Sequence, residues 1–260
     1  MKISNDIATQ AGHWYKADGS PCYTMTGANG QERNTTLRDA RKLGLYPSVT
    51  TIIKCAAAPA LENWKLDQAI LAALTLPRNP GESDEAFLAR VKQDSREQAR
   101  KAAERGTEIH GALERHFQGR PCDAELWPYV QAVKENLLAW FGETEWDAER
   151  SFAHPLGFGG KCDLHSKTGR IAVDFKGKDF TDPNDCKQYD EHLMQGAAYL
   201  KGFDIFEGGR FANVFFSRTK PGLVCIVEAQ PEDITRGWRM FAKLLEFWQE
   251  QSRYRPMVAA

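Results

Sequence analysis

The segment Gly160–Lys176, near the middle of the chain, most constrains the fold. Gly169 divides it into two runs, and in the second run apolar residues at 171, 173 and 175 alternate with small or charged ones. Alternate side chains of a strand share a face, so Asp174 and Lys176 point one way and the apolar residues point to a core. Asp163 lies in the first run, eleven residues before Asp174. If the two runs pair as a hairpin, two carboxylates and an ammonium converge.

This convergence is the chemistry of a divalent-metal site. Mg²⁺ prefers a few carboxylate oxygens and keeps several waters, which leaves room for a substrate phosphate. Asp163 and Asp174 would supply such oxygens, and the carbonyl of Phe175 is a further candidate ligand. Lys176 would orient or deprotonate a metal-bound water and offset negative charge. An Asp-x-Lys pair is by itself a weak signal, because many solvated strand faces contain one.

A histidine upstream strengthens the signal. Within 84–117, small and apolar residues recur at steps of 4, 3, 4, 3 and 4, which predicts one face of a helix with His110 on its inward stripe. A lone histidine on such a stripe is more often a core residue than a ligand. Gly106 would permit close backbone approach. Glu104 and Glu114 either approach His110 or belong to an exposed, charged helix face.

A second pair of polar residues follows downstream. Gln195 and Tyr199 stand at i and i+4, so they share one face of a predicted helix. Gly196 and the two alanines after it would let this helix lie close to the sheet. The amide and phenol are then placed to contact a phosphate or to hold Lys176. The alternative is a helix packed by Tyr199, with Gln195 at its edge.

The element order predicts a mixed α/β protein, a central sheet flanked by helices behind a mostly helical N-terminal part. Residues 13–35 indicate short strands with one or two hairpins, and a short helix over 36–42 ends at Gly44. Ser48 or Thr50 would cap a helix running toward Ala58. Residues 211–217 and 223–227 are apolar enough to be central strands. Longer helices are expected at 60–76, 84–117, 124–141, 185–202 and 231–252, and strands at 146–154, 158–166, 170–176, 211–217 and 222–229.

Composition narrows the class of protein. Hydrophobic residues make up 42% of the 260, and 34 basic residues balance 35 acidic ones, so any nucleic acid must be held by a local basic patch. The N-terminal residues lack a signal-peptide pattern, and no stretch has the length of a membrane span, which predicts a soluble, cytoplasmic protein. No two cysteines have C-x-x-C spacing, so we expect neither zinc nor an iron–sulfur cluster. The cysteines are Cys22, Cys55, Cys122, Cys162, Cys186 and Cys225.

Together the motifs resemble a known family. In order they are Gly-x-x-x-His ending at His110, Gly-x-x-Asp ending at Asp163, Asp-x-Lys ending at Lys176, and Gln-x-x-x-Tyr ending at Tyr199. This set resembles the PD-(D/E)XK nuclease superfamily, in its RecB-like branch. The segment 46–51, Tyr-Pro-Ser-Val-Thr-Thr, resembles the Ser/Thr-rich segment ahead of the core in phage-type exonucleases, and the whole chain is similar in plan to those enzymes and to the RecE nuclease domain.

The resemblance implies a restriction-endonuclease-like αβββαβ core over 84–260, with a DNA-contacting N-terminal region over 1–83 forming one compact unit with it. It implies one or two Mg²⁺ or Mn²⁺ ions, with Lys176 serving the water. Asp174 departs from the glutamate usual in this branch. The ligands implied are His110, Asp163, Asp174 and the Phe175 carbonyl, with Glu149 less certain, and Gln195 and Tyr199 would support the site.

The function implied is a metal-dependent DNA exonuclease of phage or prophage recombination. Three alternatives stay open: a structure-specific endonuclease of the same fold, a non-catalytic DNA-binding module, and an RNA-directed nuclease, which substrate choice would distinguish. A single-strand annealing protein and a homo-oligomer are partners expected from the resemblance. No base-specific readout is expected, because an exonuclease must move along any sequence. Candidate phosphate contacts, each also readable as ordinary surface charge or capping, are Ser48, Thr50, Thr51, Arg38, Arg41, Lys178, Arg218 and Lys220.

Overall fold

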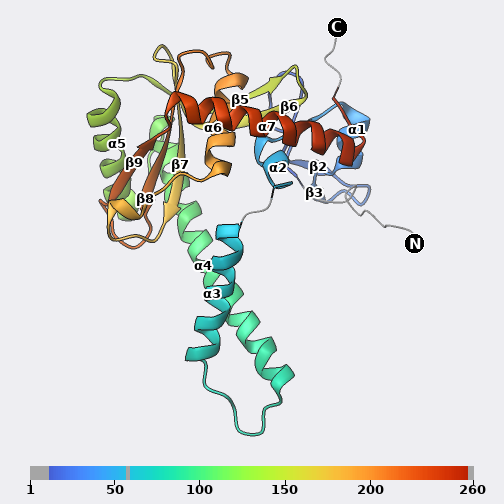
Figure 1. Ribbon diagram of the computed structural model, residues 1–260, viewed down its shortest axis with the longest axis vertical. Coiled ribbons are helices and arrows are strands. Elements are labelled where there is room, and N and C mark those ends of the chain that lie inside the picture. The colour runs from blue at the N-terminus through green and yellow to red at the C-terminus, as the bar shows by residue number, and fades with distance from the viewer. Residues whose placement is uncertain (1–11, 57–58, 257–260) are drawn as a thin grey trace.

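A five-stranded mixed sheet with helices on both faces forms the body of the protein, as the computed structural model shows for residues 12–56 and 59–256 (Figure 1). The strand order is β5-β6-β7-β8-β9. β5, β6 and β7 pair antiparallel, β7 and β8 pair parallel, and β9 returns antiparallel to β8. The strands are β5 Trp146–His154, β6 Phe158–Ser166, β7 Ile171–Lys178, β8 Arg210–Ser217 and β9 Val224–Glu228.

Helices α6 (Asp190–Gly202) and α7 (Pro231–Ser252) cover one face of the sheet. α6 crosses between the parallel strands β7 and β8, as a parallel connection requires. Its close approach depends on Gly196, where an added Cβ would lie 2.1 Å from the Phe211 ring. α7 has an apolar stripe that includes Phe241 and Leu245, both buried in this face's core. Contacts with the sheet and with α7 therefore fix the position of the α6 side chains over the strands.

The opposite face is covered by α5 (Trp127–Phe141) and the C-terminal part of α4 (Asp84–Phe117). Ile109 and Leu113 of α4 are fully buried against Val173 and Phe175 of β7. Because β7 buries apolar side chains on this face and Ala172 on the other, the strand lies between two cores. This sandwich brings α4 and α6 to opposite sides of the same strand.

The N-terminal region packs beside the start of β6 and on α6 and α7. Strand β1 (Trp14–Tyr15) pairs with β4 (Tyr46–Pro47), and β2 (Thr24–Thr26) forms a hairpin with β3 (Glu32–Asn34). The short helix α1 (Leu37–Leu43) ends at a left-handed Gly44, as the sequence predicts. α2 (Val49–Ile53) is capped by the Ser48 hydroxyl, which accepts from Thr51 N.

An arm of two helices projects from this body (Figure 1). α3 (Pro59–Thr75) packs along the N-terminal part of α4, and residues 76–83 connect them at the tip. Ala72 and Val91 are buried in the arm. The expected boundary between residues 83 and 84 falls at this tip, so the arm contains residues from both sides of it.

The expected fold class is confirmed, and most expected elements match the observed ones within a few residues. Four expectations are wrong. β9 is an edge strand, and its apolar residues are half-buried because α5 packs against it. The helix expected from 185 begins at Asp190, because a 3₁₀ turn (Pro183–Asp185) and an extended segment come first. The α2 helix ends at Ile53, well before Ala58, which lies outside the described residues together with Ala57. Gly106 does not serve close packing, since an added Cβ would make only an ordinary 3.6 Å contact.

The described helices include none with the length and apolar character that crossing a lipid bilayer requires.

Candidate metal centre and catalytic site

Four polar side chains form a row across the sheet: Glu149, Asp163, Asp174 and Asn213. The residues that flank the first pair are in register between β5 and β6, which places Glu149 opposite Asp163. The register of β6 with β7 continues in the same way and places Asp163 opposite Asp174. Asp174 pairs in parallel register with Asn213 of β8. The expected hairpin therefore forms and sets the two aspartates on facing positions.

The strands part where the aspartates face each other. β6 and β7 pair at Leu164–Val173 and His165–Ala172. Beyond this point the Asp163 carboxylate takes the place of a backbone acceptor, and Phe175 N donates to its Oδ2 at 2.6 Å. A side chain thus occupies the space between the two strands, where a cation can reach the carboxylates.

Three groups from three elements meet beside this gap. One ligand atom each from His110, Glu149 and Asp163 lies within 4.8 Å of the others, a spacing at which the three can share a metal ion. His110 Nε2 is 3.1 Å from Asp163 Oδ2, and the imidazole stands edge-on to the Phe175 ring. Imidazole and carboxylate donors suit Mn²⁺ and, for the oxygens, Mg²⁺. Glu104 instead pairs with Arg100 one turn earlier on α4, and Glu114 pairs with Arg120, just past the end of that helix.

Glu149 has an unusual backbone. Its φ is +58°, in the left-handed region, although it stands inside a strand. Non-glycine residues in this region are uncommon and are held there by their surroundings. Its carboxylate is nearly buried and forms a close ion pair with the Lys161 ammonium. The local bend turns the carboxylate toward His110 and Asp163.

Asp174 stands apart from that trio and is surrounded by donors. Its Oδ2 accepts from Lys176 Nζ at 2.6 Å and from Asn213 Nδ2 at 3.1 Å, and its Oδ1 accepts from Gln195 Nε2 at 2.8 Å. The residue is 3% exposed. A carboxylate held by three donors has a fixed orientation. Asp174 therefore keeps a fixed place in the row, next to Asp163.

Gln195 links the row to α6. Its Oε1 accepts from Lys176 Nζ at 3.0 Å, and its amide nitrogen donates to Tyr199 Oη at 2.8 Å as well as to Asp174. Gly196 makes this reach possible, because it lets α6 sit directly on Phe211 of β8. The sequence predicts that Gln195 and Tyr199 share a face and either contact a phosphate or hold Lys176. In the structure the contact with Lys176 is made by Gln195.

Burial and pairing set the electrostatics. Burial raises the pKa of Asp174, against the opposing effect of Lys176. At Asp163 burial is outweighed by the hydrogen bond and charge of His110, so its pKa is lowered. The same pairing raises the His110 pKa despite burial, and Asp174 raises that of Lys176 despite burial. Each of the three carboxylates in the row therefore has a cationic partner in the absence of metal.

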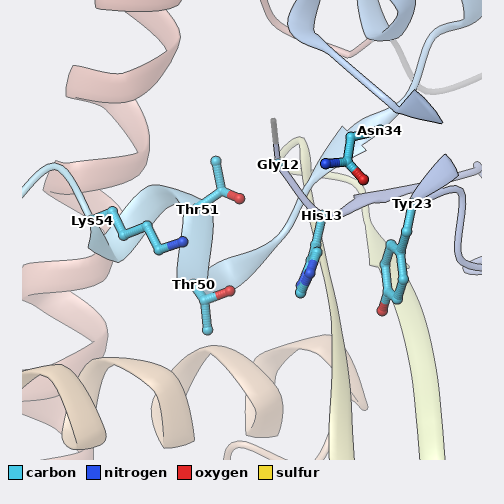
Figure 2. A pocket seen from close by; sticks show the side chains of 7 residues that line it. All are labelled: Gly12, His13, Tyr23, Asn34, Thr50, Thr51 and Lys54. Atoms are coloured by element: carbon cyan, nitrogen blue, oxygen red, sulfur yellow. The ribbon is translucent and has the colours of Figure 1, made fainter. Parts of the chain in front are cut away.

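A polar cavity of about 150 Å³ opens beside the start of β6 (Figure 2). Thr50 and Thr51 of α2 lie between Lys54 and His13 in it, with Asn34 and Tyr23 on the far side. Ser48 pairs with Gly159 of β6, which ties α2 to the strand that carries Asp163. Burial and the charges of Lys54 and Lys161 lower the His13 pKa. The cavity therefore combines hydroxyl donors with positive charge on the side of the row where Lys161 lies.

The expected DNA contacts are not all gathered here. Arg41 donates to the Ser252 carbonyl at the end of α7, and Arg218 binds Asp179 with two nitrogens at 2.9 Å and Ala102 O with a third, so both hold elements together. Lys178 donates to Asp185 O. The Ser48 hydroxyl is buried as a helix cap. Arg38 is exposed on α1, and Lys220 is exposed in the turn after β8.

Sequence reasoning missed one residue of the row, Asn213, and two residues that contact the row, Gln188 and Lys161. Asn213 is a fully buried amide in the otherwise apolar run 211–216, and a polar residue inside such a strand is the signal that would have found it. Gln188 Nε2 donates to its Oδ1 at 3.0 Å and so directs its Nδ2 to Asp174. Lys161 stands two residues before Asp163 and pairs with Glu149, an arrangement that depends on the β5–β6 register.

Comparisons with known proteins find only distant similarity to this chain. No family model and no curated protein matches the chain. Two solved structures similar to it are a candidate exonuclease from Eubacterium rectale and an alkaline exonuclease from Laribacter hongkongensis. The first has 11% identity and a TM-score of 0.44, covering 57% of this chain and 68% of the other. The second has 12% identity and a TM-score of 0.35, covering 74% and 95%.

Proposed function

We propose that this chain is a divalent-metal-dependent deoxyribonuclease of the PD-(D/E)XK type that hydrolyses DNA from its ends. The observation that carries the proposal is the row of Glu149, Asp163 and Asp174 across three adjacent strands, with Lys176 held against the last of them. Buried carboxylates in one row repel each other, and a fold retains them where a cation is bound. End-directed action is inferred from the sequence resemblance.

The donor set fits a hard divalent cation. His110, Glu149 and Asp163 would hold it, and Asp174 and the Phe175 carbonyl, placed on the facing strand, are the further ligands that the sequence predicts. All are nitrogen or oxygen donors, which suits Mn²⁺ or Mg²⁺. When bound, such an ion supplies Lewis-acid activation of the phosphodiester and of the attacking water. Binding would require His110 to lose the proton that it shares with Asp163 and would separate Lys161 from Glu149, so affinity should rise with pH.

The protein's own groups prepare the site for a phosphate. Lys176 places an ammonium beside the row, where it offsets the negative charge that grows on a phosphate under attack. Asp174 and Gln195 hold that ammonium from two sides, at 2.6 and 3.0 Å. Asn213 and Tyr199 hold Asp174 and Gln195 in turn. The lysine therefore needs little rearrangement when substrate arrives.

The cavity at α2 extends the proposed substrate path. Hydroxyls of Thr50 and Thr51 with the Lys54 ammonium form a sequence-independent contact for a DNA phosphate. Since Ser48 joins this segment to β6, a strand bound there would be led toward Asp163. Lys54 lines this cavity and takes the role of cationic contact there, whereas Arg41 and Arg218, which the sequence indicates, hold elements of the fold together.

The test is digestion of end-labelled single- and double-stranded DNA with Mg²⁺, with Mn²⁺ and with EDTA. We expect cleavage with either metal, none with EDTA, and loss of at least about 100-fold in Lys176→Ala. Lys167→Ala is the matched control, because Lys167 is an exposed lysine paired with Glu145 outside the row. Full activity of Lys176→Ala would overturn the assignment.

Two further comparisons separate the alternatives. Linear and covalently closed DNA distinguish an exonuclease from a structure-specific endonuclease, which would cut both. Calorimetry with Mn²⁺ on Asp163→Asn tests the metal site apart from turnover. DNA binding without hydrolysis in both metals would favour the non-catalytic module. A role in phage recombination beside a single-strand annealing protein belongs to the same proposal and is tested by co-purification with such a protein.

A further inference from the structure

In the arm, the large apolar residues of α3 lie on the side exposed to solvent and not on the side that packs against α4. On α3, Leu66, Ile70 and Leu74 are 59%, 48% and 77% exposed. The positions turned toward α4 are smaller and more polar and include Gln68 and Ala72. A helix normally buries its apolar face against its neighbour. The three exposed side chains are spaced by four residues and form one stripe along α3. Trp64 and Leu71 are also exposed and lie roughly 100–120° further around the helix.

The charge of the arm argues against a nucleic acid as its binding partner. A DNA-binding surface needs an excess of basic residues. The arm has none, because its charges cancel between residues 62 and 105. Lysines and arginines stand at 65, 78, 90, 92, 96, 100, 101 and 105, and aspartates and glutamates at 62, 67, 82, 84, 85, 94, 97 and 104.

The stripe is complementary to itself. Leu66 and Leu74 lie four residues before and after Ile70. If two copies of α3 pair antiparallel about a two-fold axis at Ile70, each Leu66 meets the Leu74 of the other copy, and the isoleucines meet on the axis.

The geometry of the arm permits this pairing. The arm projects from the body (Figure 1). Antiparallel copies would therefore place the two bodies at opposite ends of the paired arms, with each α3 between its own α4 and the α3 of the other copy. Burial of a leucine or isoleucine removes roughly 60–120 Å² from water, so the five half-exposed side chains together give at most about 300 Å² of apolar surface per copy. Since about 60% of an interface is apolar, the total is at most about 500 Å² per copy, which is the size of a weak, transient contact.

We propose that the exposed stripe of α3 is the interface of a homodimer, in which two arms pair antiparallel about Ile70. The expected affinity is micromolar, as the modest area requires. The inference is independent of the nuclease proposal, because no residue of the stripe belongs to the row of carboxylates or its partners.

Sedimentation velocity from 2 to 200 µM tests the interface. We expect the wild-type chain to pass from monomer to dimer over this range, and Ile70→Glu to raise the dissociation constant at least about 100-fold. Leu138→Glu is the matched control, because Leu138 is 47% exposed on helix α5, far from the arm in sequence, and should dimerise like wild type. A wild-type chain that stays monomeric at 200 µM, or an Ile70→Glu variant that dimerises normally, would overturn the proposal.

Cysteine cross-linking tests the antiparallel register. Ile70→Cys should cross-link to itself, and a mixture of Leu66→Cys with Leu74→Cys should give a mixed dimer that neither variant forms alone. The wild-type chain, which has six cysteines of its own, supplies the background. Self-cross-linking of Leu66→Cys above that background indicates parallel arms and contradicts the register. These positions are exposed in the monomer, so the variants should keep wild-type circular dichroism.

Discussion

Replacement of Gln195 by leucine removes the amide that joins α6 to the row and keeps a similar volume. Gln195 is 7% exposed and makes three hydrogen bonds, to Lys176, Asp174 and Tyr199. A hydrogen bond to a charged group contributes about 1.5–3 kcal/mol and a neutral one about 1 kcal/mol. Lys176 and Asp174 retain each other, so the low end applies to both.

We therefore expect Gln195→Leu to lower the free energy of unfolding by about 4 kcal/mol. For a chain of this size that corresponds to a fall in Tm of roughly 8–16 °C. The measurement is urea denaturation followed by circular dichroism, with thermal scans beside it. Leucine is a good helix former, so the change in helix propensity contributes little.

Gln131→Leu is the control for this prediction. Gln131 lies exposed on α5 and its amide donates to Glu135 one turn later, so the substitution should change stability by no more than about 0.5 kcal/mol. If Gln195→Leu costs less than about 1 kcal/mol, or no more than Gln131→Leu, the amide does not hold the row together and the reasoning fails.

Three further predictions rest on single residues. Glu149→Gln should weaken Mn²⁺ binding at least about tenfold by calorimetry, and unchanged affinity would exclude Glu149 as a ligand. Burial, helped by Lys176, lowers the His192 pKa to about 3 from 6.5. Because the unfolded chain then binds more protons, stability should fall below pH 6.5, by roughly 2 kcal/mol at pH 5. In denaturant titrations His192→Asn should flatten that slope, and a persisting slope would assign it elsewhere. Gly196→Ala should cost about 2–3 kcal/mol in such titrations, because its Cβ meets Phe211, whereas Gly111→Ala should be neutral or stabilising; equal effects would contradict the close packing.

Much of the fold follows from local pattern. The long helix over 84–117 and the strands over 146–154 and 158–166 are confirmed at both ends, because their periodicity is strong and their boundaries carry caps or turns. The helix that contains Gln195 begins at Asp190, later than the expected start at 185. The 3₁₀ turn Pro183–Asp185 and the non-helical residues 186–189 come before it.

The sequence by itself determined that Asp163 and Asp174 stand on facing strands, because alternation and the turn at Gly169 set which residues pair. It also determined that His110 and Gln195 lie on inward helix faces. Only the tertiary structure decided which partner each group has: Asp163 meets His110 of α4, and Asp174 meets Gln195 of α6. The physical reason is that β7 lies between two helical layers. The periodicity of a single segment does not specify which helix packs on which face of a sheet.

The tertiary structure also decided the roles of Asn213 and Glu149. Asn213 joins the row because β8 lies parallel to β7, a pairing made by residues about forty positions apart. Glu149 turns to the site through a left-handed backbone that the surrounding contacts hold in place. The exposed stripe on α3 is the converse case: its apolar period predicts a buried helix, and the fold of one chain leaves it uncovered.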